Sequence, residues 1–241
     1  MITISLENGT TISIENSQVT PYYQRTETLE LVKAFESADA FVSADYHLCK
    51  YFLKDKSSPE YKQYILDTEK CIELHNKRVG KDDIVLFLGD LTEEEFGELS
   101  PSNPVIKEVK NKISKLNGKI IMLTGNNDSF GDNFYKSLGI QCVLRLNEIS
   151  KGTKNVYSHY PVNVSGGKLN IHGHIHGSKK YWSIDYKNHI DCYWKLWDGP
   201  MRISEFENAY NSGKYTGCET INVDANAIEE LGENAGYDQH K

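Results

Sequence analysis

The sequence predicts an α/β fold that is built on a mainly parallel β-sheet. In the first half of the 241-residue chain, short apolar strand patterns alternate with segments in which apolar residues recur at helical spacing. Alternating strands and helices are typical of parallel βα units, because a strand returns parallel to its neighbour only through a long crossover. After about residue 141 strand patterns follow one another across short turns, which indicates that antiparallel pairing takes over.

The N-terminal half begins with a predicted hairpin. Residues 2–14 alternate apolar and polar side chains around Asn8-Gly9, a dipeptide typical of two-residue hairpin turns. Thr92 and Glu95 have the spacing of a capping box, so a helix is predicted to begin there. The other helices of this half are predicted at 26–35, 59–77 and 105–116, and the strands at 40–44, 84–88 and 119–123.

Strand patterns dominate the second half, and the chain shows no linker that would separate two domains. We expect one domain over 1–213 with the hairpin as an extension over about 1–24. Residues 214–241 are rich in Asn, Glu and Gly and are expected to form an acidic C-terminal tail. Strands are predicted at 141–146, 154–158, 168–174, 181–186 and 189–197, and one helix at 204–210.

Charge and hydropathy exclude several classes of protein. With 27 Lys and Arg against 34 Asp and Glu, the formal net charge is −7, which argues against nucleic acid as a partner, because such binding relies on cations that neutralise phosphates. Apolar runs reach only about five residues, too short to span a membrane. The first ten residues lack the apolar core of a signal peptide, and the 5 cysteines are scattered without CxxC spacing, so we expect a cytoplasmic protein with reduced thiols.

Polar side chains able to bind metal follow the predicted strands at the points where the strands end. Because the carboxyl ends of parallel strands meet at one edge of a sheet, we expect these side chains to lie close together. An aspartate followed two residues later by a histidine, or two histidines at this spacing, can bind a divalent metal ion from one face. In chain order the motifs are Asp45-x-His47, Gly89-Asp90, Gly125-Asn126-Asn127-Asp128, His159 and Gly173-His174-Ile175-His176.

Only the ordered set predicts a metal site. A lone Asp-x-His or His-x-His pair is more often an ordinary surface or core pair than a pair of ligands. Five motifs in one order, each at the end of a strand pattern and together holding four of the 8 histidines, are not explained by coincidence. The glycines before Asp90, Asn126 and His174 fit this interpretation, because a backbone that turns sharply beside a ligand favours glycine.

The ordered motifs resemble those of the calcineurin-like metallophosphoesterase superfamily, which has Asp-x-His, Gly-Asp, Gly-Asn-His-Asp, His and Gly-His-x-His in this order. Within it, the runs Leu116-Asn117-Gly118-Lys119 and Ser158-His159-Tyr160-Pro161 are similar to a small bacterial and phage-type subgroup of predicted phosphoesterases. The resemblance covers about residues 38–210. It implies a four-layer α/β sandwich, in which two mixed sheets pack face to face and are flanked by helices.

The resemblance also implies a centre of two divalent metal ions, with Asp90 as the bridge between them. Nitrogen and oxygen donors without a thiolate suit Mn²⁺, which we expect, with Fe, Zn, Co or Ni as alternatives. The first ion would be held by Asp45, His47 and His176, and the second by Asn126, His159 and His174.

By the same resemblance, the chain is expected to hydrolyse a small phosphoester or nucleotide through in-line attack by a hydroxide that bridges the ions. The expected catalytic residues are Asn127, Asp128 and His174, with Asp128 fixing a ligand loop by hydrogen bonding. Asn127 stands where the superfamily usually has a histidine that protonates the leaving group, and an amide cannot supply that proton. Because a diester needs less acid assistance than many monoesters, this departure favours a phosphodiester, such as a cyclic or other small nucleotide.

Several alternatives stay open from the sequence. A phosphomonoesterase or a nuclease would have the same centre, and a non-catalytic scaffold on this fold would be expected to have lost ligands, whereas all seven are present. His172 shares strand parity with His174 and His176 and is expected either to orient a ligand or simply to pack. His75 is expected in solvent, and the sequence sets no oligomeric state.

Overall fold

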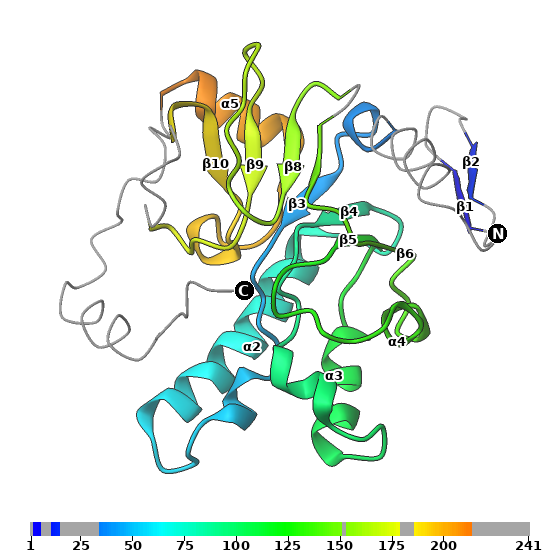
Figure 1. Cartoon of the computed structure of the whole chain (residues 1–241), viewed down its shortest axis with the longest axis vertical. Coiled ribbons are helices and arrows are strands. Elements are labelled where there is room, and N and C mark those ends of the chain that lie inside the picture. Colours follow the sequence, from blue (N-terminus) through cyan, green and yellow to red (C-terminus); the bar gives the residue numbers. More distant parts are fainter. Residues whose placement is uncertain (1, 6–10, 15–33, 151–152, 179–185, 214–241) are drawn as a thin grey trace.

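The computed structural model describes residues 2–5, 11–14, 34–150, 153–178 and 186–213 (Figure 1). The predicted tail at 214–241, residues 181–185 of one predicted strand and most of the predicted helix at 26–35 lie outside these residues. The last part of that helix is described, as a helical segment at 34–37. The strands β1 (Ile2–Ser5) and β2 (Thr11–Ile14) pair antiparallel, so the predicted hairpin is confirmed, although its Asn8-Gly9 turn lies outside the described residues.

The first sheet has the strand order β11-β3-β4-β5-β6. Its four parallel strands contain the apolar runs that predicted them, and the parallel direction is confirmed for β3, β4 and β5. The strand β6 also pairs parallel with β5, although antiparallel pairing was expected from about residue 141. A short fifth strand, which the sequence did not indicate, pairs antiparallel with β3 at one edge. The strands are β3 (Phe41–Ser43), β4 (Ile84–Phe87), β5 (Lys119–Leu123), β6 (Cys142–Leu144) and β11 (Met201–Arg202).

The second sheet has the order β10-β9-β8-β7 and corrects one expectation. Antiparallel pairing occurs only between β7 and β8, whereas β8, β9 and β10 run parallel to one another. The reason is that the segments after β8 and β9 are crossovers that carry polar motifs, not tight hairpin turns. The strands are β7 (Glu148–Ile149), β8 (Val156–Ser158), β9 (Asn170–His172) and β10 (His189–Asp191).

Alternation along the strands of the first sheet builds two cores. One core contains Leu86 of β4 together with Ile171 of β9 and Ile190 of β10, so it joins the two sheets. The other contains Val85 and Phe87, the neighbours of Leu86 that point to the opposite face of β4, packed with the helices. Helices α2 and α3 therefore cover the outer face of the first sheet, and α5 lies beside the second sheet (Figure 1). The predicted class, two mixed sheets flanked by helices, is confirmed.

Local sequence signals explain where the main helices begin. The Ser58 hydroxyl accepts a hydrogen bond from the amide of Tyr61 at 3.2 Å, and Asn103 Oδ1 accepts from the amide of Val105 at 2.8 Å. A proline follows each cap, where its missing N–H costs nothing. The helices are α2 (Pro59–Arg78), α3 (Pro104–Ile113), α4 (Asp132–Ser137) and α5 (Ile203–Asn211), of which only α4 was not predicted.

The helix predicted to begin at Thr92 is instead the short 3₁₀ helix η2 (Glu94–Glu98). The capping box does not form, because Thr92 is buried and its hydroxyl contacts the Tyr135 hydroxyl at 3.1 Å. Other 3₁₀ segments are η1 (Lys50–Leu53), η3 (Tyr186–Asn188) and η4 (Trp194–Leu196). Among the described helices, none is long and apolar enough to cross a membrane.

Candidate metal centre

Seven polar side chains from the predicted motifs meet where the two sheets adjoin. Three loops leave the carboxyl ends of β3, β4 and β5 in the first sheet, and two leave β8 and β9 in the second. The sheets are joined at this point by a bridge between Ala44 and Tyr193. The motifs therefore converge because both sheets direct their carboxyl ends to the same side of the molecule.

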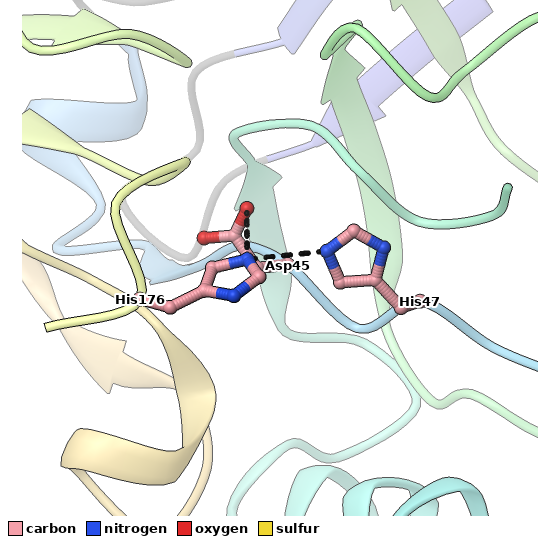
Figure 2. Close-up of side chains that lie close together, drawn as sticks. All are labelled: Asp45, His47 and His176. Carbon is pink, nitrogen blue, oxygen red and sulfur yellow. Dashed lines mark hydrogen bonds and ion pairs between the residues drawn. The ribbon is translucent and has the colours of Figure 1, made fainter. Parts of the chain in front are cut away.

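The first cluster consists of Asp45, His47 and His176, whose potential ligand atoms all lie within 4.8 Å of one another. The Nε2 atoms of the two histidines are 3.2 Å apart, and His176 Nε2 lies 3.6 Å from Asp45 Oδ1 (Figure 2). Figure 2 shows both imidazole rings and the carboxylate turned toward a common point. Two ring nitrogens and one carboxylate oxygen form a donor set that suits a divalent transition metal.

The second cluster consists of Asp90, His159 and His174, again with ligand atoms within 4.8 Å of one another. His159 Nε2 lies 3.2 Å from His174 Nδ1 and 2.9 Å from Asn126 Oδ1. Asn126 thus adds a neutral oxygen donor to two nitrogens and a carboxylate. The four side chains also form a donor set for a divalent metal ion, without a thiolate.

Asp90 lies between the two clusters. Its Oδ2 atom is 3.7 Å from His47 Nε2 of the first cluster, and its Oδ1 atom is 3.5 Å from His159 Nε2 of the second. The two oxygens of one carboxylate therefore face different clusters. A carboxylate in this arrangement can be shared by two cations.

Burying an ionised carboxylate costs free energy unless a positive charge lies beside it. The pKa of Asp45 is raised to about 8, mainly by burial and further by the negative charge of Asp90. Among the described residues, no lysine or arginine forms an ion pair with Asp45 or Asp90. Divalent cations would supply the missing positive charge, so the donor set and the local charge both fit a pair of metal ions.

A family model described as calcineurin-like phosphoesterase matches residues 41–223 of the chain. The chain belongs to the calcineurin-like phosphoesterase family. Members of this family typically bind two metal ions, and the two clusters described above agree with that number.

Two solved structures are similar to this family member at low identity. One is AQ665, a protein of unknown function from Aquifex aeolicus, at 17% identity and a TM-score of 0.45, over 70% of this chain and 97% of that chain. The other is nuclease MPE from Pseudomonas putida, at 19% identity and a TM-score of 0.39, over 58% of this chain and 63% of that chain. No curated protein matches the chain.

Backbone strain concentrates at the phosphoesterase motifs. Residues other than glycine rarely adopt a positive φ, which costs about 1–2 kcal/mol per residue. Strained conformations of this kind cluster at functional sites, where the surrounding structure holds them. Five of the seven clustered residues have this conformation: Asp45 (φ 60°), His47 (46°), Asp90 (56°), His174 (72°) and His176 (50°).

Two of the predicted glycines allow close approach to the carboxylates. A Cβ atom on Gly125 would lie 2.2 Å from Asp90 Oδ1, and one on Gly173 would lie 2.7 Å from Asp45 Oδ2. Both distances are far below van der Waals contact. Any larger residue at these positions would displace a carboxylate of the centre.

Asn127 is turned toward Asp90. Its backbone N–H donates to Asp90 Oδ1 at 2.9 Å, and its side-chain Nδ2 donates to Asp90 Oδ2 at 2.7 Å. Asn127 therefore fixes the orientation of the carboxylate that lies between the clusters. The side-chain amide of Asn127 donates to Asp90 and cannot supply a proton to a leaving group. In this it differs from the histidine that is usual at this position of the motif.

Asp128 lies beneath the centre and is buried. Its carboxylate accepts hydrogen bonds from the backbone amides of Asp90 at 2.7 Å, Leu91 at 3.0 Å and Gly125 at 2.8 Å. These contacts tie the loop after β4 to the loop after β5, in agreement with a residue that fixes ligand loops. The pKa of Asp128 is raised to about 6, mainly by burial and in part by the nearby charge of Asp90.

The other predicted histidines are buried. The ring of His172 donates from Nδ1 to the Gly173 carbonyl at 2.9 Å and packs against His189 at a centroid distance of 5.6 Å. His75 is not in solvent, which corrects the expectation: its Nε2 donates to the Asn117 carbonyl at 2.8 Å, and its Nδ1 accepts from the Tyr46 hydroxyl at 2.7 Å. Since Cys71 and Ile72 lie one turn earlier on α2, the apolar stripe could have indicated this burial.

Two acidic residues near the centre were missed from the sequence. The Glu93 carboxylate lies 2.8 Å from His47 Nδ1, and its position within a capping-box pattern concealed it. The Asp191 carboxylate accepts from the backbone amides of Gly177 at 2.6 Å and Tyr193 at 2.9 Å, and so braces the loop that carries His176. Asp191 is the last residue of β10, but the strand was predicted to continue to residue 197, so the strand-end rule passed over it.

Proposed function

We propose that this member of the family is a dinuclear metal-dependent phosphoesterase that hydrolyses a small phosphodiester, such as a cyclic or other small nucleotide. The observation that carries the proposal is the position of Asp90, whose two oxygens face one histidine in each cluster at 3.7 and 3.5 Å. Two cations held by a shared carboxylate can clamp the phosphoryl group of a substrate between them.

In this proposal, each ion is held by three side chains in addition to Asp90. Mn²⁺ is the proposed metal, because nitrogen and oxygen donors predominate and no thiolate lies in either cluster. When bound, the pair of ions would polarise the phosphoryl oxygens and lower the pKa of an attacking water. The ligands are Asp45, His47 and His176 for the first ion, and Asn126, His159 and His174 for the second.

The chain's own residues keep this centre in place. The backbone N–H of His174 donates to both oxygens of Asp45 at 3.0 and 2.9 Å, so His174 fixes a carboxylate of the first cluster while its ring belongs to the second. Asn127 holds Asp90 in the same way, and Asp128 holds the loops. In this role the three expected catalytic residues position the ligands and, through them, the substrate.

The preference for a diester is supported by Asn127, which cannot act as an acid. Both oxygens of Asp90 engage Asn127, and an amide has no proton to give near neutral pH. A diester with a good leaving group depends least on such a proton. A nucleotide is supported by Tyr160, which is 42% exposed and has its ring 4.2 Å from the His174 ring, so a base could stack beside the centre.

The test is hydrolysis by the full chain after metal removal and reconstitution with Mn²⁺. Bis-p-nitrophenyl phosphate, p-nitrophenyl phosphate, a cyclic nucleotide and a single-stranded oligonucleotide are compared at equal concentration. We expect the diesters of low mass to be hydrolysed faster than the monoester, and Asp90→Asn to lose metal and activity together. Faster cleavage of the monoester would indicate a phosphomonoesterase, and faster cleavage of the oligonucleotide would indicate a nuclease. A protein that binds two ions but hydrolyses none of these substrates would favour a non-catalytic scaffold.

A further inference from the structure

A buried carboxylate, that of Glu93, touches the centre from outside both clusters. Its side chain is only 4% exposed, and its Oε1 atom lies 2.8 Å from Nδ1 of His47. Lys50 Nζ lies 3.4 Å from the same oxygen. The ammonium group of Lys50 therefore helps to keep this carboxylate ionised and in place.

The contact decides which nitrogen of His47 carries the proton. An ionised carboxylate can only accept a hydrogen bond, so the proton of neutral His47 lies on Nδ1. A neutral imidazole in water prefers its proton on Nε2, and Glu93 reverses that preference here. The lone pair is then on Nε2, the atom that faces His176 Nε2 at 3.2 Å and Asp90 Oδ2 at 3.7 Å.

The backbone holds Glu93 in register with His47. The amide of His47 donates to the carbonyl of Asp90 at 3.0 Å, and the amide of Leu48 donates to the carbonyl of Leu91, also at 3.0 Å. The loops after β3 and β4 therefore run side by side. Glu93 follows in extended conformation, with φ −114° and ψ 146°, which brings its side chain to His47.

The two clusters differ in this outer contact. At His159 in the second cluster, Nδ1 lies 2.9 Å from the backbone carbonyl of Leu88, a neutral acceptor. At His47 in the first cluster the acceptor is a carboxylate. An anionic acceptor makes an imidazole a stronger metal ligand than a neutral one does, so the outer contact of His47 strengthens that ligand more than the outer contact of His159 does.

We infer that Glu93 is a positioning residue that fixes the tautomer of His47 and thereby strengthens binding of a divalent cation at Asp45, His47 and His176. This role rests on the proposed metal centre and deepens it, because it makes the two cation sites unequal. Lys50 restrains Glu93.

The test measures Mn²⁺ binding to the chelated full chain by isothermal titration calorimetry. Glu93→Gln keeps the size of the side chain and removes its charge, and Glu93→Leu also removes the acceptor. Glu95→Gln is the matched control, because it removes the same charge from an exposed position two residues away. We expect Glu93→Leu to weaken one of two bound equivalents by about 10–100-fold, Glu93→Gln to weaken it less, and Glu95→Gln to bind as the wild type does.

A second measurement needs no metal. Long-range ¹H–¹⁵N spectra of the metal-free protein report which imidazole nitrogen of His47 is protonated, with His159 as the internal reference. We expect protonation on Nδ1 of His47 in the wild type and a shift toward Nε2 in Glu93→Leu, while His159 is unchanged. A tautomer that does not change would contradict the inference even where the variant is less stable.

The outcomes separate this inference from the proposed function. Wild-type protein that binds fewer than two equivalents of Mn²⁺ would overturn the metal centre and the role of Glu93 together. Two equivalents with wild-type affinity in Glu93→Leu, or an equal loss at both equivalents, would overturn only the role of Glu93. Weakening of a single equivalent, together with the change of tautomer, would support it.

Discussion

The side-chain amide of Asn127 donates a hydrogen bond to Asp90 Oδ2 at 2.7 Å, while the backbone N–H of the same residue donates to Oδ1 at 2.9 Å. One residue thus engages both oxygens of the carboxylate that lies between the two clusters. Asn127, which stands where the motif usually has a histidine, therefore helps to hold the centre in place.

Replacing Asn127 is expected to slow catalysis without removing a ligand. A hydrogen bond to a charged group contributes about 1.5–3 kcal/mol, so Asn127→Ala is expected to lower kcat/KM by about 10–100-fold. Asn127→Asp is expected to do more harm, because it replaces a donor by a second negative charge. The measurement is kcat/KM for a p-nitrophenyl diester, with metal content determined by elemental analysis. The exposed Asn133→Ala serves as the control, and equal activity of both alanine variants would contradict the role of Asn127.

Replacing Gly125 by a residue with a side chain is expected to disturb the centre. A Cβ atom at this position would lie 2.2 Å from Asp90 Oδ1, so Gly125→Ala must displace the shared carboxylate. We expect a loss of about 1–3 kcal/mol in the free energy of unfolding, together with loss of metal binding. Gly131→Ala is the matched control, because no atom lies within 4 Å of its Cβ position. Chemical denaturation and metal titration check both variants, and a Gly125→Ala protein with wild-type metal affinity would show that the loop can shift.

Metal removal is expected to leave the fold intact. The two apolar cores lie between the sheets and beneath α2 and α3 and contain none of the seven ligands, so we expect their packing not to depend on ions. Chelation should therefore abolish turnover and keep the far-ultraviolet circular dichroism spectrum. Because ions that bind only the folded state stabilise it by mass action, the Tm should rise with added Mn²⁺. Cooperative loss of the helical signal at neutral pH after chelation would contradict this expectation.

His75 is expected to make stability depend on pH. Burial lowers the pKa of His75 from its ordinary value of 6.5 to about 4. Between about pH 6.5 and 4 the unfolded chain takes up a proton at this residue and the folded chain does not, so the free energy of unfolding decreases as the pH falls. The shift corresponds to about 3 kcal/mol across this window.

The variant that checks this dependence is His75→Gln, which can still donate one hydrogen bond and accept another. Urea unfolding of the chelated protein is compared with the wild type at several pH values. The wild-type advantage is expected to be largest near pH 7 and to shrink toward pH 4. An advantage that stays constant over this range would show that His75 does not titrate on unfolding.

The sequence predicts those residues of the site that directly follow a predicted strand. Asp45, Asp90 and Asn126 follow apolar runs that have the length of buried strands, so their meeting follows from parallel pairing alone. Glu93 and Asp191 escaped notice for different reasons. Glu93 has a local interpretation as a helix start, and Asp191 lies inside the strand predicted at 189–197, although the strand of the structure ends at Asp191.

The sequence by itself determined the class of fold, most of its longer strands and helices, and the residues that follow the strand ends, because these depend on periodicity and on short-range turn chemistry. Only the tertiary structure decided that β8, β9 and β10 run parallel, that Thr92 contacts Tyr135 instead of capping a helix, and that Glu93 faces His47. Each of these features depends on which distant segment lies beside it. Pairing and side-chain contacts over such separations are set by the packing of the whole chain, which no local pattern records.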